Sequence, residues 1–373
     1  MARKRICLVC ADPATFDAFL FPHAVRLAAD FEVAVACHGR PRRAGQVNAT
    51  FHAVPVERRV NPLRDLRALF ALRRLFRRER FDAVHSFTPK AGLLAMLAAR
   101  ATGVPRRLHT FTGQVWATQR GVKRSFLKAL DRKLAGAATH VLADSASQAR
   151  FLVAEGVVDD ARLTVIGDGS ICGVDLARFR PDPAARAAVR AELGIGTEAL
   201  VLLFLGRLTR DKGVADLARA FAQMQAAPAA WLVLVGPDEE EMQPRLRTAL
   251  GDRVAHVRFV PATAAPERFL AAADVLCLPS RREGFGSVII EAAACGCPCV
   301  ASRIYGITDA VEEGQGGLLH PPGDVAALRD CLGRLAADRE LAARLGREAR
   351  ARAERLFPEQ RLTDGLAAFY HAL

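Results

Sequence analysis

The first half of the chain alternates short, continuously apolar runs with longer amphipathic segments. The apolar runs have the length of buried strands and read RICLVCA, EVAVACH, FDAVHSF, RLHTFTG and THVLADS. The amphipathic segments fit helices over residues 19–29, 63–80, 91–101 and 123–134. Apolar strands that alternate with helices are typical of a parallel sheet covered on both faces. We therefore expect an α/β domain over residues 1–180.

The same alternation restarts in the second half. An Ala-, Arg- and Glu-rich stretch over residues 181–197 is the expected linker, and apolar runs such as ALVLLFLGR, AWLVLVG and VLCLPS predict a second domain over residues 198–355. Residues 356–373 predict a C-terminal helix that we expect to cross back to the N-terminal domain. The predicted fold class is α/β, with two Rossmann-like parallel-sheet domains facing a central cleft that binds ligands at the carboxyl ends of the strands.

Composition narrows the class of protein. With 373 residues, 51% of them hydrophobic and 25% charged, the chain suits two globular domains and not a disordered or fibrous protein. No apolar run reaches the roughly 18 to 20 residues of a membrane-spanning helix, and the first residues do not read as a signal peptide. The nine cysteines lack paired spacing, so we expect reduced, buried thiols in a cytoplasmic protein.

The net charge of +13 comes from arginine, because only six of the 53 basic residues are lysine. An arginine-rich surface suits phosphates, anionic lipid or nucleic acid, although a genome rich in Arg and Ala codons is an alternative source. The run LRDLRALFALRRLFRRERF mixes arginines with Leu and Phe, and such a helix can lie on an anionic membrane. An ordinary helix with its arginines in water fits equally well.

The stretch FLGRLTRDKGVADL combines a buried strand, a glycine turn and a helix start. Gly206 ends the strand, Gly213 precedes the helix, and Arg207 and Lys212 lie between them. Glycines let a ligand approach the backbone, and a helix N-terminus with two cations suits a diphosphate. A plain turn with solvated charges is the alternative.

A second strand leads into the loop REGFGS and another helix start. Glu283 lies in this loop, while Glu291 falls about one turn into the helix, where a carboxylate can bind two hydroxyls such as a ribose diol. The alternative is a capping glutamate with a solvated one. A glycosidase pair fits poorly, because its two acids must face one bond from opposite sides. The alternating Cys295, Cys297 and Cys299 have strand spacing and not the spacing of zinc ligands.

The motifs GRLTRDKG, PSRREGFGSVIIEAAACGCPCVAS and YGITDAVEEGQGGLLHPPGD follow in this order through the C-terminal half. Together they resemble the retaining glycosyltransferases of family 4, which adopt the GT-B fold. In the N-terminal half, FDAVHSFTPKAGLLAMLAARATGVP, HTFTGQVW and GDGSICGVDLARF are similar to the subgroup that resembles capsule and O-antigen transferases. Members of that subgroup add sugars to polyprenyl-diphosphate-linked acceptors.

The resemblance implies roles for individual residues. The implied catalytic set binds the donor's diphosphate and sugar and consists of Arg207, Lys212 and Glu283. The implied donor-binding set holds the ribose, base, sugar and phosphates and consists of Gly206, Gly213, Gly284, Phe285, Gly286, Ser287, Glu291, Val260 and Pro261. Such enzymes work without a bound metal or other cofactor, because the cations stabilise the leaving nucleotide.

One position departs from the family pattern on the acceptor side. Where members often carry a His-Gly pair, this chain has Thr112 and Gly113, and His109 lies three residues earlier. His109 is therefore either a substitute or a structural residue of the strand. Lys90 follows a strand and precedes a helix, which suits an acceptor phosphate.

The leading hypothesis is a cytoplasmic transferase, peripheral at the inner face of the plasma membrane. It would move a sugar of the N-acetylhexosamine type from a UDP-sugar donor to a lipid-diphosphate-linked acceptor in surface polysaccharide synthesis. A nucleotide-sugar epimerase of the same fold is a second hypothesis, disfavoured by the Arg-Lys and Glu-x7-Glu pattern. A basic nucleic-acid-binding protein is a third, but the chain lacks a reading module, and two Trp and two Tyr make a poor stacking platform.

Overall fold

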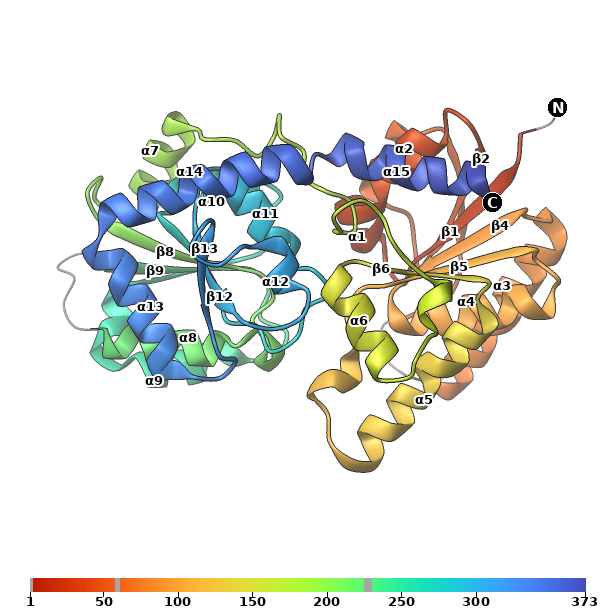
Figure 1. Cartoon of the computed structure of the whole chain (residues 1–373), viewed down its shortest axis with the longest axis horizontal. Coiled ribbons are helices and arrows are strands. Elements are labelled where there is room, and N and C mark those ends of the chain that lie inside the picture. The colour runs from red at the N-terminus through yellow and green to blue at the C-terminus, as the bar shows by residue number, and fades with distance from the viewer. Residues whose placement is uncertain (1–2, 58–60, 225–229) are drawn as a thin grey trace. The chain divides into compact units, whose positions relative to one another are not determined.

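The computed structural model describes residues 3–57, 61–224 and 230–373, which fold into two compact units (Figure 1). The first unit contains the chain up to Cys172 together with Glu359–Leu373, and the second contains Gly173–Pro358. Each unit holds one parallel β-sheet with a hydrophobic core on either face. The predicted α/β class with two Rossmann-like domains is confirmed.

The first unit is built on a seven-stranded sheet in the order β3-β2-β1-β4-β5-β6-β7. Its strands are β1 (Arg5–Val9), β2 (Glu32–Cys37), β3 (Ala49–Ala53), β4 (Ala83–Phe87), β5 (Arg106–Phe111), β6 (His140–Ala143) and β7 (Leu163–Val165). Because side chains alternate along a strand, Cys7 and Val9 of β1 face one core while Ile6 and Leu8 face the other. Both faces of the sheet must therefore be covered by helices.

The first core lies under three helices that follow successive strands. They are α3 (Pro62–Glu79), α4 (Pro89–Ala101) and α5 (Gly121–Ala137), and α6 (Ala146–Ala154) follows β6. Helix α3 begins where the Asn61 side chain accepts a hydrogen bond from the amide of Arg64 and Pro62 fixes the first turn. It ends at Arg80, which adopts a left-handed conformation (φ 51°).

The opposite core lies under the N-terminal and C-terminal helices of the chain. Residues 13–27 form α1 (Pro13–Thr15), a π-helical turn (Phe16–Leu20) and α2 (Phe21–Leu27), so the helix expected over residues 19–29 starts within the π-helical turn and continues as α2. Helix α15 (Glu359–Ala372) packs beside α2 (Figure 1) and buries Leu362, Leu366 and Tyr370. The Tyr370 hydroxyl lies 2.9 Å from Nδ1 of His85 in β4. The last fifteen residues are thus part of the first unit.

The second unit has a six-stranded sheet in the order β10-β9-β8-β11-β12-β13. Its strands are β8 (Leu200–Leu205), β9 (Ala230–Val235), β10 (Val257–Val260), β11 (Val275–Leu278), β12 (Cys299–Ser302) and β13 (Gly317–His320). Its helices are α7 (Pro183–Glu192), α8 (Val214–Gln223), α9 (Met242–Leu250), α10 (Pro266–Ala272), α11 (Ser287–Ala294), α12 (Ile307–Ala310), α13 (Val325–Ala337) and α14 (Arg339–Leu356). Short 3-10 turns span Arg42–Gln46, Val115–Thr118, Asp160–Arg162, Arg210–Lys212 and Gly251–His256.

The expected linker over residues 181–197 differs from the structure, because it contains α7 and lies inside the second unit. Helix α7 packs against α10. The buried guanidinium of Arg190 donates to the carbonyl oxygens of Ala272 and Thr197 and lies 2.8 Å from a carboxylate oxygen of Asp274. These contacts fix the segment to its domain, so the chain passes between units at residues 172–173 and 358–359.

Candidate active site

Most of the predicted donor-binding residues lie at the point where the strand order of the second sheet reverses, between β8 and β11. Strand β8 has β9 on one side and β11 on the other, so the loops after β8 and β11 leave adjacent strands at the same edge. In open α/β sheets this switch point is where ligands bind. The two motif loops, residues 206–213 and 279–286, are the loops at this point.

Gly213 allows the two loops to touch. It has a left-handed backbone (φ 68°) just before α8, and a β-carbon there would overlap the carbonyl oxygen of Pro279. The Arg281 amide donates to the Asp211 carbonyl oxygen (2.8 Å), and the Arg282 guanidinium lies 3.1 Å from the Asp211 carboxylate. The chain therefore needs a residue without a side chain at this position.

Lys212 and Glu283, one from each loop, form an ion pair. Lys212 Nζ lies 2.5 Å from Glu283 Oε1, and that oxygen also accepts a hydrogen bond from the Ser280 hydroxyl at 2.7 Å. Both side chains are mostly buried, with 20% of Lys212 and 12% of Glu283 exposed. Two of the three residues implied as catalytic are thus in direct contact, although 70 residues separate them in the sequence.

Arg207 lies on the same β8 loop but makes a different pair. Its guanidinium is 2.8 Å from the Glu239 carboxylate, and both side chains are more than a third exposed. An ion pair in this position contributes roughly 0 to 1 kcal/mol, so an incoming phosphate can replace the carboxylate at small cost. Arg207 is therefore available to an anionic ligand.

Glu291 is the fifth residue of α11 and is partly buried. Burial raises its pKa to about 7, with the Arg178 charge opposing the rise and the Glu267 charge adding to it. A carboxyl group in this state gains from hydroxyl donors that stabilise its ionised form. Its position suits a diol ligand near neutral pH.

The backbone before α11 forms the rest of the predicted donor site. Gly286 is left-handed (φ 82°) and Ser287 opens the helix, so the first two amides of the helix have no partner within it, while the Ile289 amide donates to the Gly286 carbonyl oxygen (2.8 Å). The Phe285 side chain is buried and packs edge-on against Phe357. Phe285 therefore has only its backbone to offer a ligand.

Val260 and Pro261 lie apart from these loops within the same unit. Val260 ends β10, which pairs with β9, and it is partly exposed, while Pro261 is exposed. They lie at the same carboxyl edge, two strands from β8. The sheet thus places them at the same edge as the Lys212–Glu283 pair but two strands away.

The predicted acceptor-side residues lie in the first unit. Lys90 is the second residue of α4 and pairs with Asp65 at the start of α3. Thr112 and Gly113 follow β5, and Gly113 has a positive φ of 108°. Lys90 and Thr112 are partly exposed, so they remain accessible to a ligand.

His109 is enclosed by the first sheet. It lies within β5, is 1% exposed, and its Nδ1 is 2.9 Å from the Ser86 hydroxyl. Burial lowers its pKa to about 3. A β-carbon on Gly92 of α4 would overlap the imidazole ring, so helix and ring are in close contact. These contacts favour the structural alternative over a substitute catalytic histidine.

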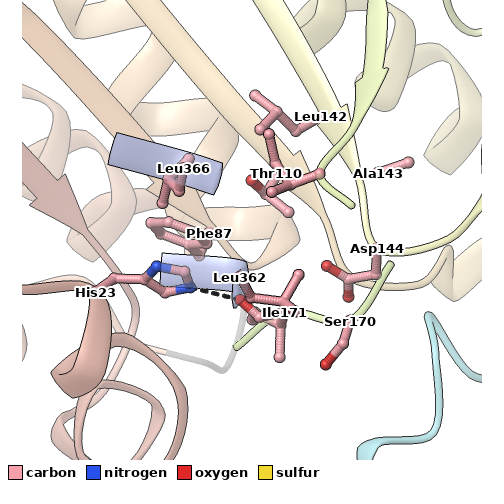
Figure 2. A pocket seen from close by; sticks show the side chains of 11 residues that line it. His23, Phe87, Thr110, Leu142, Ala143, Asp144, Ser170, Ile171, Leu362 and Leu366 are labelled. Atoms are coloured by element: carbon pink, nitrogen blue, oxygen red, sulfur yellow. Dashed lines mark hydrogen bonds between the residues drawn. The ribbon is translucent and has the colours of Figure 1, made fainter. Parts of the chain in front are cut away.

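Sequence reasoning missed a small cavity in the first unit (Figure 2). It measures about 20 Å³, which is room for a water molecule. Figure 2 shows His23 and Asp144 on either side of Ile171. Within the described chain, Asp144 Oδ1 and His23 Nδ1 are buried without a hydrogen-bond partner, and burial raises the pKa of Asp144 to about 8. In the sequence, the only sign was an acid near the end of the predicted strand THVLADS.

Comparison with known proteins shows which family of enzymes the two units resemble. Residues 23–169 match the family described as "Glycosyl transferase 4-like domain" and residues 185–352 match "Glycosyl transferases group 1". Sucrose-phosphate synthase from Thermosynechococcus elongatus has the same fold, with a TM-score of 0.84, 24% identity and 99% coverage of both chains. So does HepE from Anabaena, solved with UDP and glucose, with a TM-score of 0.83, 21% identity and full coverage of both. The fold is that of a GT-B glycosyltransferase.

Three proteins with similar sequences are also named as glycosyltransferases. CapM, a capsular polysaccharide biosynthesis glycosyltransferase of Staphylococcus aureus, is 27% identical over 87% of this chain and 85% of its own length. A D-inositol 3-phosphate glycosyltransferase of Acidothermus cellulolyticus is 32% identical over 78% and 67%. An Escherichia coli UDP-Gal:alpha-D-GlcNAc-diphosphoundecaprenol alpha-1,3-galactosyltransferase is 28% identical over 76% and 74%. The chain belongs to glycosyltransferase family 4, as its motifs predicted.

Proposed function

We propose that this protein is a retaining transferase that moves a sugar from a UDP-sugar donor to a lipid-diphosphate-linked acceptor. The sugar is proposed to be of the N-acetylhexosamine type, and the product a bacterial surface polysaccharide or glycan. The contact between Lys212 and Glu283 carries the proposal, because it joins both donor motifs at the switch point of one sheet. The UDP and glucose bound to HepE support a UDP-sugar donor.

The donor is proposed to bind along the β8 and β11 loops. Lys212 and Arg207 would hold the diphosphate, and Glu291 would accept hydrogen bonds from the ribose diol. Glu283 and the backbone amides of residues 284–287 would hold the sugar, with the base near Val260 and Pro261. Two cations at the diphosphate would supply the electrostatic stabilisation that a metal ion supplies elsewhere, so no metal is proposed.

The reaction is proposed to take place on one face of the donor sugar. The acceptor oxygen forms a bond to the anomeric carbon as the bond from that carbon to the phosphate oxygen breaks. The leaving phosphate takes the acceptor proton, and Lys212 and Arg207 stabilise the charge that develops on UDP. This route needs no protein base, which agrees with the burial of His109.

The acceptor is proposed to bind the first unit near Lys90, Thr112 and Gly113. Lys90 is held by Asp65 in a partly buried pair, and a diphosphate would compete with that carboxylate. The names of CapM and of the Escherichia coli galactosyltransferase support a polysaccharide or diphosphoundecaprenol acceptor. An enzyme with such an acceptor would work at the cytoplasmic face of the plasma membrane, bound peripherally.

A transfer assay tests this function. The purified protein is incubated with a panel of UDP-sugars and either a polyprenyl-diphosphate-linked sugar or D-inositol 3-phosphate, the compound in the name of the Acidothermus cellulolyticus relative. We expect UDP release with the lipid acceptor and NMR coupling constants that show a retained anomeric configuration. Absence of UDP release with every donor, or an inverted product, would reject the proposal, and release with inositol phosphate alone would reject the acceptor.

A further inference from the structure

The positive charge of the protein is concentrated on three helices of the first unit. Helix α3 carries six arginines and two acids, α4 carries two basic residues, and α5 carries five basic residues and one acid. The rest of the chain then holds 40 basic and 37 acidic residues, which almost balance. A base composition that favours arginine codons would spread the excess over the whole chain. The charge is therefore a local feature of this surface.

The same helices expose large apolar side chains. In the part of the chain that the structure describes, seven large hydrophobic side chains are exposed, and six of them lie on α3, on α5 or in the turn just before α5. These six, with their exposed fractions, are Leu63 (75%), Leu66 (50%), Phe70 (57%), Val115 (40%), Val122 (87%) and Phe126 (61%). Exposed apolar side chains that gather in one region mark an interaction surface.

The three helices lie side by side on one face of the sheet. Helix α4 packs against both α3 and α5, and Figure 1 shows the three on the same side of the first unit. Helix α3 buries Ala68, Leu72 and Phe76 toward the core, so Leu63, Leu66 and Phe70 lie on its outer side. On α5, Val122 and Phe126 are one turn apart and share a side.

The apolar and basic residues follow an order along α3. Helices of a parallel α/β domain begin near the carboxyl ends of the strands, so Leu63 and Leu66 lie toward that edge, as do Val122 and Phe126 on α5. Further along α3, Phe70 lines a shallow surface groove together with Arg73, Arg74, Arg77 and Arg78. Apolar side chains with arginines beside them are the pattern of a helix that lies in a lipid headgroup layer.

We propose that the outer surface of α3, α4 and α5 docks on an anionic membrane. The apolar side chains of α3 and α5 would enter the layer between headgroups and acyl chains, while the arginines bind lipid phosphates. A second copy of this chain is a poor occupant, because two such positive surfaces repel each other. No described helix is long and apolar enough to cross a bilayer. This inference names the membrane partner of the proposed function but stands on its own observations.

Vesicle co-sedimentation of the full chain tests the surface, with no donor or acceptor present. The vesicles contain either phosphatidylcholine alone or phosphatidylcholine with about 30% phosphatidylglycerol. We expect binding to the anionic vesicles, at least about tenfold weaker binding to the neutral ones, and weakening with salt as charges are screened. Equal binding to both vesicle types, or no binding, would overturn the proposal.

Two double variants separate the apolar and basic contributions. Val122→Asp with Phe126→Asp removes the apolar side chains of α5, and Arg74→Glu with Arg77→Glu reverses charge on α3. Each should reduce binding to anionic vesicles at least about tenfold. The matched controls are Val25→Asp on α2, the seventh exposed apolar residue, and Arg347→Glu with Arg350→Glu on α14. Retained binding in either test variant, or equal loss in the controls, would contradict the assignment.

Further measurements separate this proposal from the proposed function and from other partners. UDP-sugar affinity should be unchanged in all four variants, because none alters the donor loops, and far-UV circular dichroism should report unchanged folding. If vesicle binding fails while UDP release persists, the membrane surface alone is wrong. If a DNA oligonucleotide binds the wild type tightly and anionic vesicles do not, the surface serves nucleic acid and the membrane proposal is overturned.

Discussion

The pair of Lys212 and Glu283 holds the two donor loops together before any ligand binds. A diphosphate that approaches Lys212 meets an ammonium group already positioned by a carboxylate 2.5 Å away and by the close contact of Gly213 with Pro279. Preorganised charge of this kind stabilises a leaving group without further rearrangement. The residues of this site therefore act together, and single substitutions should have large effects.

If Lys212 holds the leaving diphosphate as proposed, Lys212→Ala should reduce the rate of UDP release at least about 100-fold, because it removes that cation. The matched control is Arg210→Ala in the same loop. Arg210 is 70% exposed and pairs with Glu240 across 3.9 Å, so its loss should change the rate less than about threefold. Initial rates at saturating donor measure both variants. Equal losses would show that the loop, and not the Lys212 charge, limits the reaction.

Glu291 should make donor binding depend on pH. Its pKa is raised to about 7, so most of the carboxyl is protonated at pH 6 and ionised at pH 8. If the ribose diol binds the ionised form, affinity for a UDP-sugar should be about tenfold weaker at pH 6 than at pH 8. A UDP-sugar is the right probe, because its diphosphate does not titrate in this range.

Glu291→Gln is the control for this pH dependence. It should bind the donor more weakly at pH 8 and show a flat profile between pH 6 and pH 8, measured by calorimetric titration. A wild-type profile that is flat, or a variant that keeps the slope, would contradict the ribose role.

Some of these residues could be read from the sequence and others could not. Lys212 and Glu283 lie beside glycines in loops that follow apolar strands, and Glu291 lies one turn into the helix after the second loop, so their place near a sheet edge followed from local pattern. His23 and Asp144 became notable only because Ile171 and α15, distant in sequence, cover them. A single polar residue near a strand carries no local sign that it will be buried without a partner.

At the scale of elements, the loop after β8 depends on one backbone position. Gly213→Ala would place a β-carbon into the Pro279 carbonyl at a left-handed residue. Gly314→Ala is the matched control, since Gly314 lies in the same unit and also has a positive φ (78°) but has open space around it. We expect Gly314→Ala to lower the free energy of unfolding by about 1 kcal/mol, and Gly213→Ala by at least about 2 kcal/mol.

Chemical denaturation of both glycine variants measures the difference. A Gly213→Ala protein as stable as Gly314→Ala would mean that the β11 loop moves away from the β8 loop at little cost. That outcome would weaken the argument that close contact of the loops preorganises the site.

Helices were predicted well where the 3.6-residue hydrophobic period and the residues that cap the helix start indicate the same bounds, and less well elsewhere. The helix expected over residues 63–80 is α3, with Asn61 and Pro62 at its start. The helix expected over residues 19–29 is α-helical at Phe21–Leu27, whereas Phe19 and Leu20 belong to a π-helical turn that begins at Phe16 and does not follow the 3.6-residue period. The segment 181–197 looked like a linker because its composition is polar, yet Arg190 is buried by carbonyl oxygens and Asp274, which composition does not reveal.

At the scale of the molecule, the first unit is made from two separate pieces of chain. Its C-terminal piece, α15, buries Leu366 and Tyr370, and it is tied to the rest of the unit by the ion pairs of Arg26 with Asp364 and Arg361 with Asp168. The second unit is one continuous segment. The fold class followed from the strand–helix alternation, whereas this division of the first unit depends on contacts between residues as far as 338 positions apart.

A chain truncated after Pro358 should lose the fold of the first unit and keep that of the second. Without α15, a face of the first sheet that holds Leu8, Phe87 and Leu108 loses its cover. Hydrogen exchange should show deprotected amides in β1, β4 and β5 and protected amides in β8 and β11. Unchanged protection in the first unit would mean that α15 adds little to its stability.

The central claim is that the loops after β8 and β11 bind a nucleotide-sugar. A crystal structure with a UDP-sugar tests it most directly. We predict the diphosphate within hydrogen-bond distance of Lys212 and Arg207, and the ribose hydroxyls on the Glu291 carboxylate. A UDP-sugar bound elsewhere, or bound with its diphosphate away from Lys212, would contradict the account.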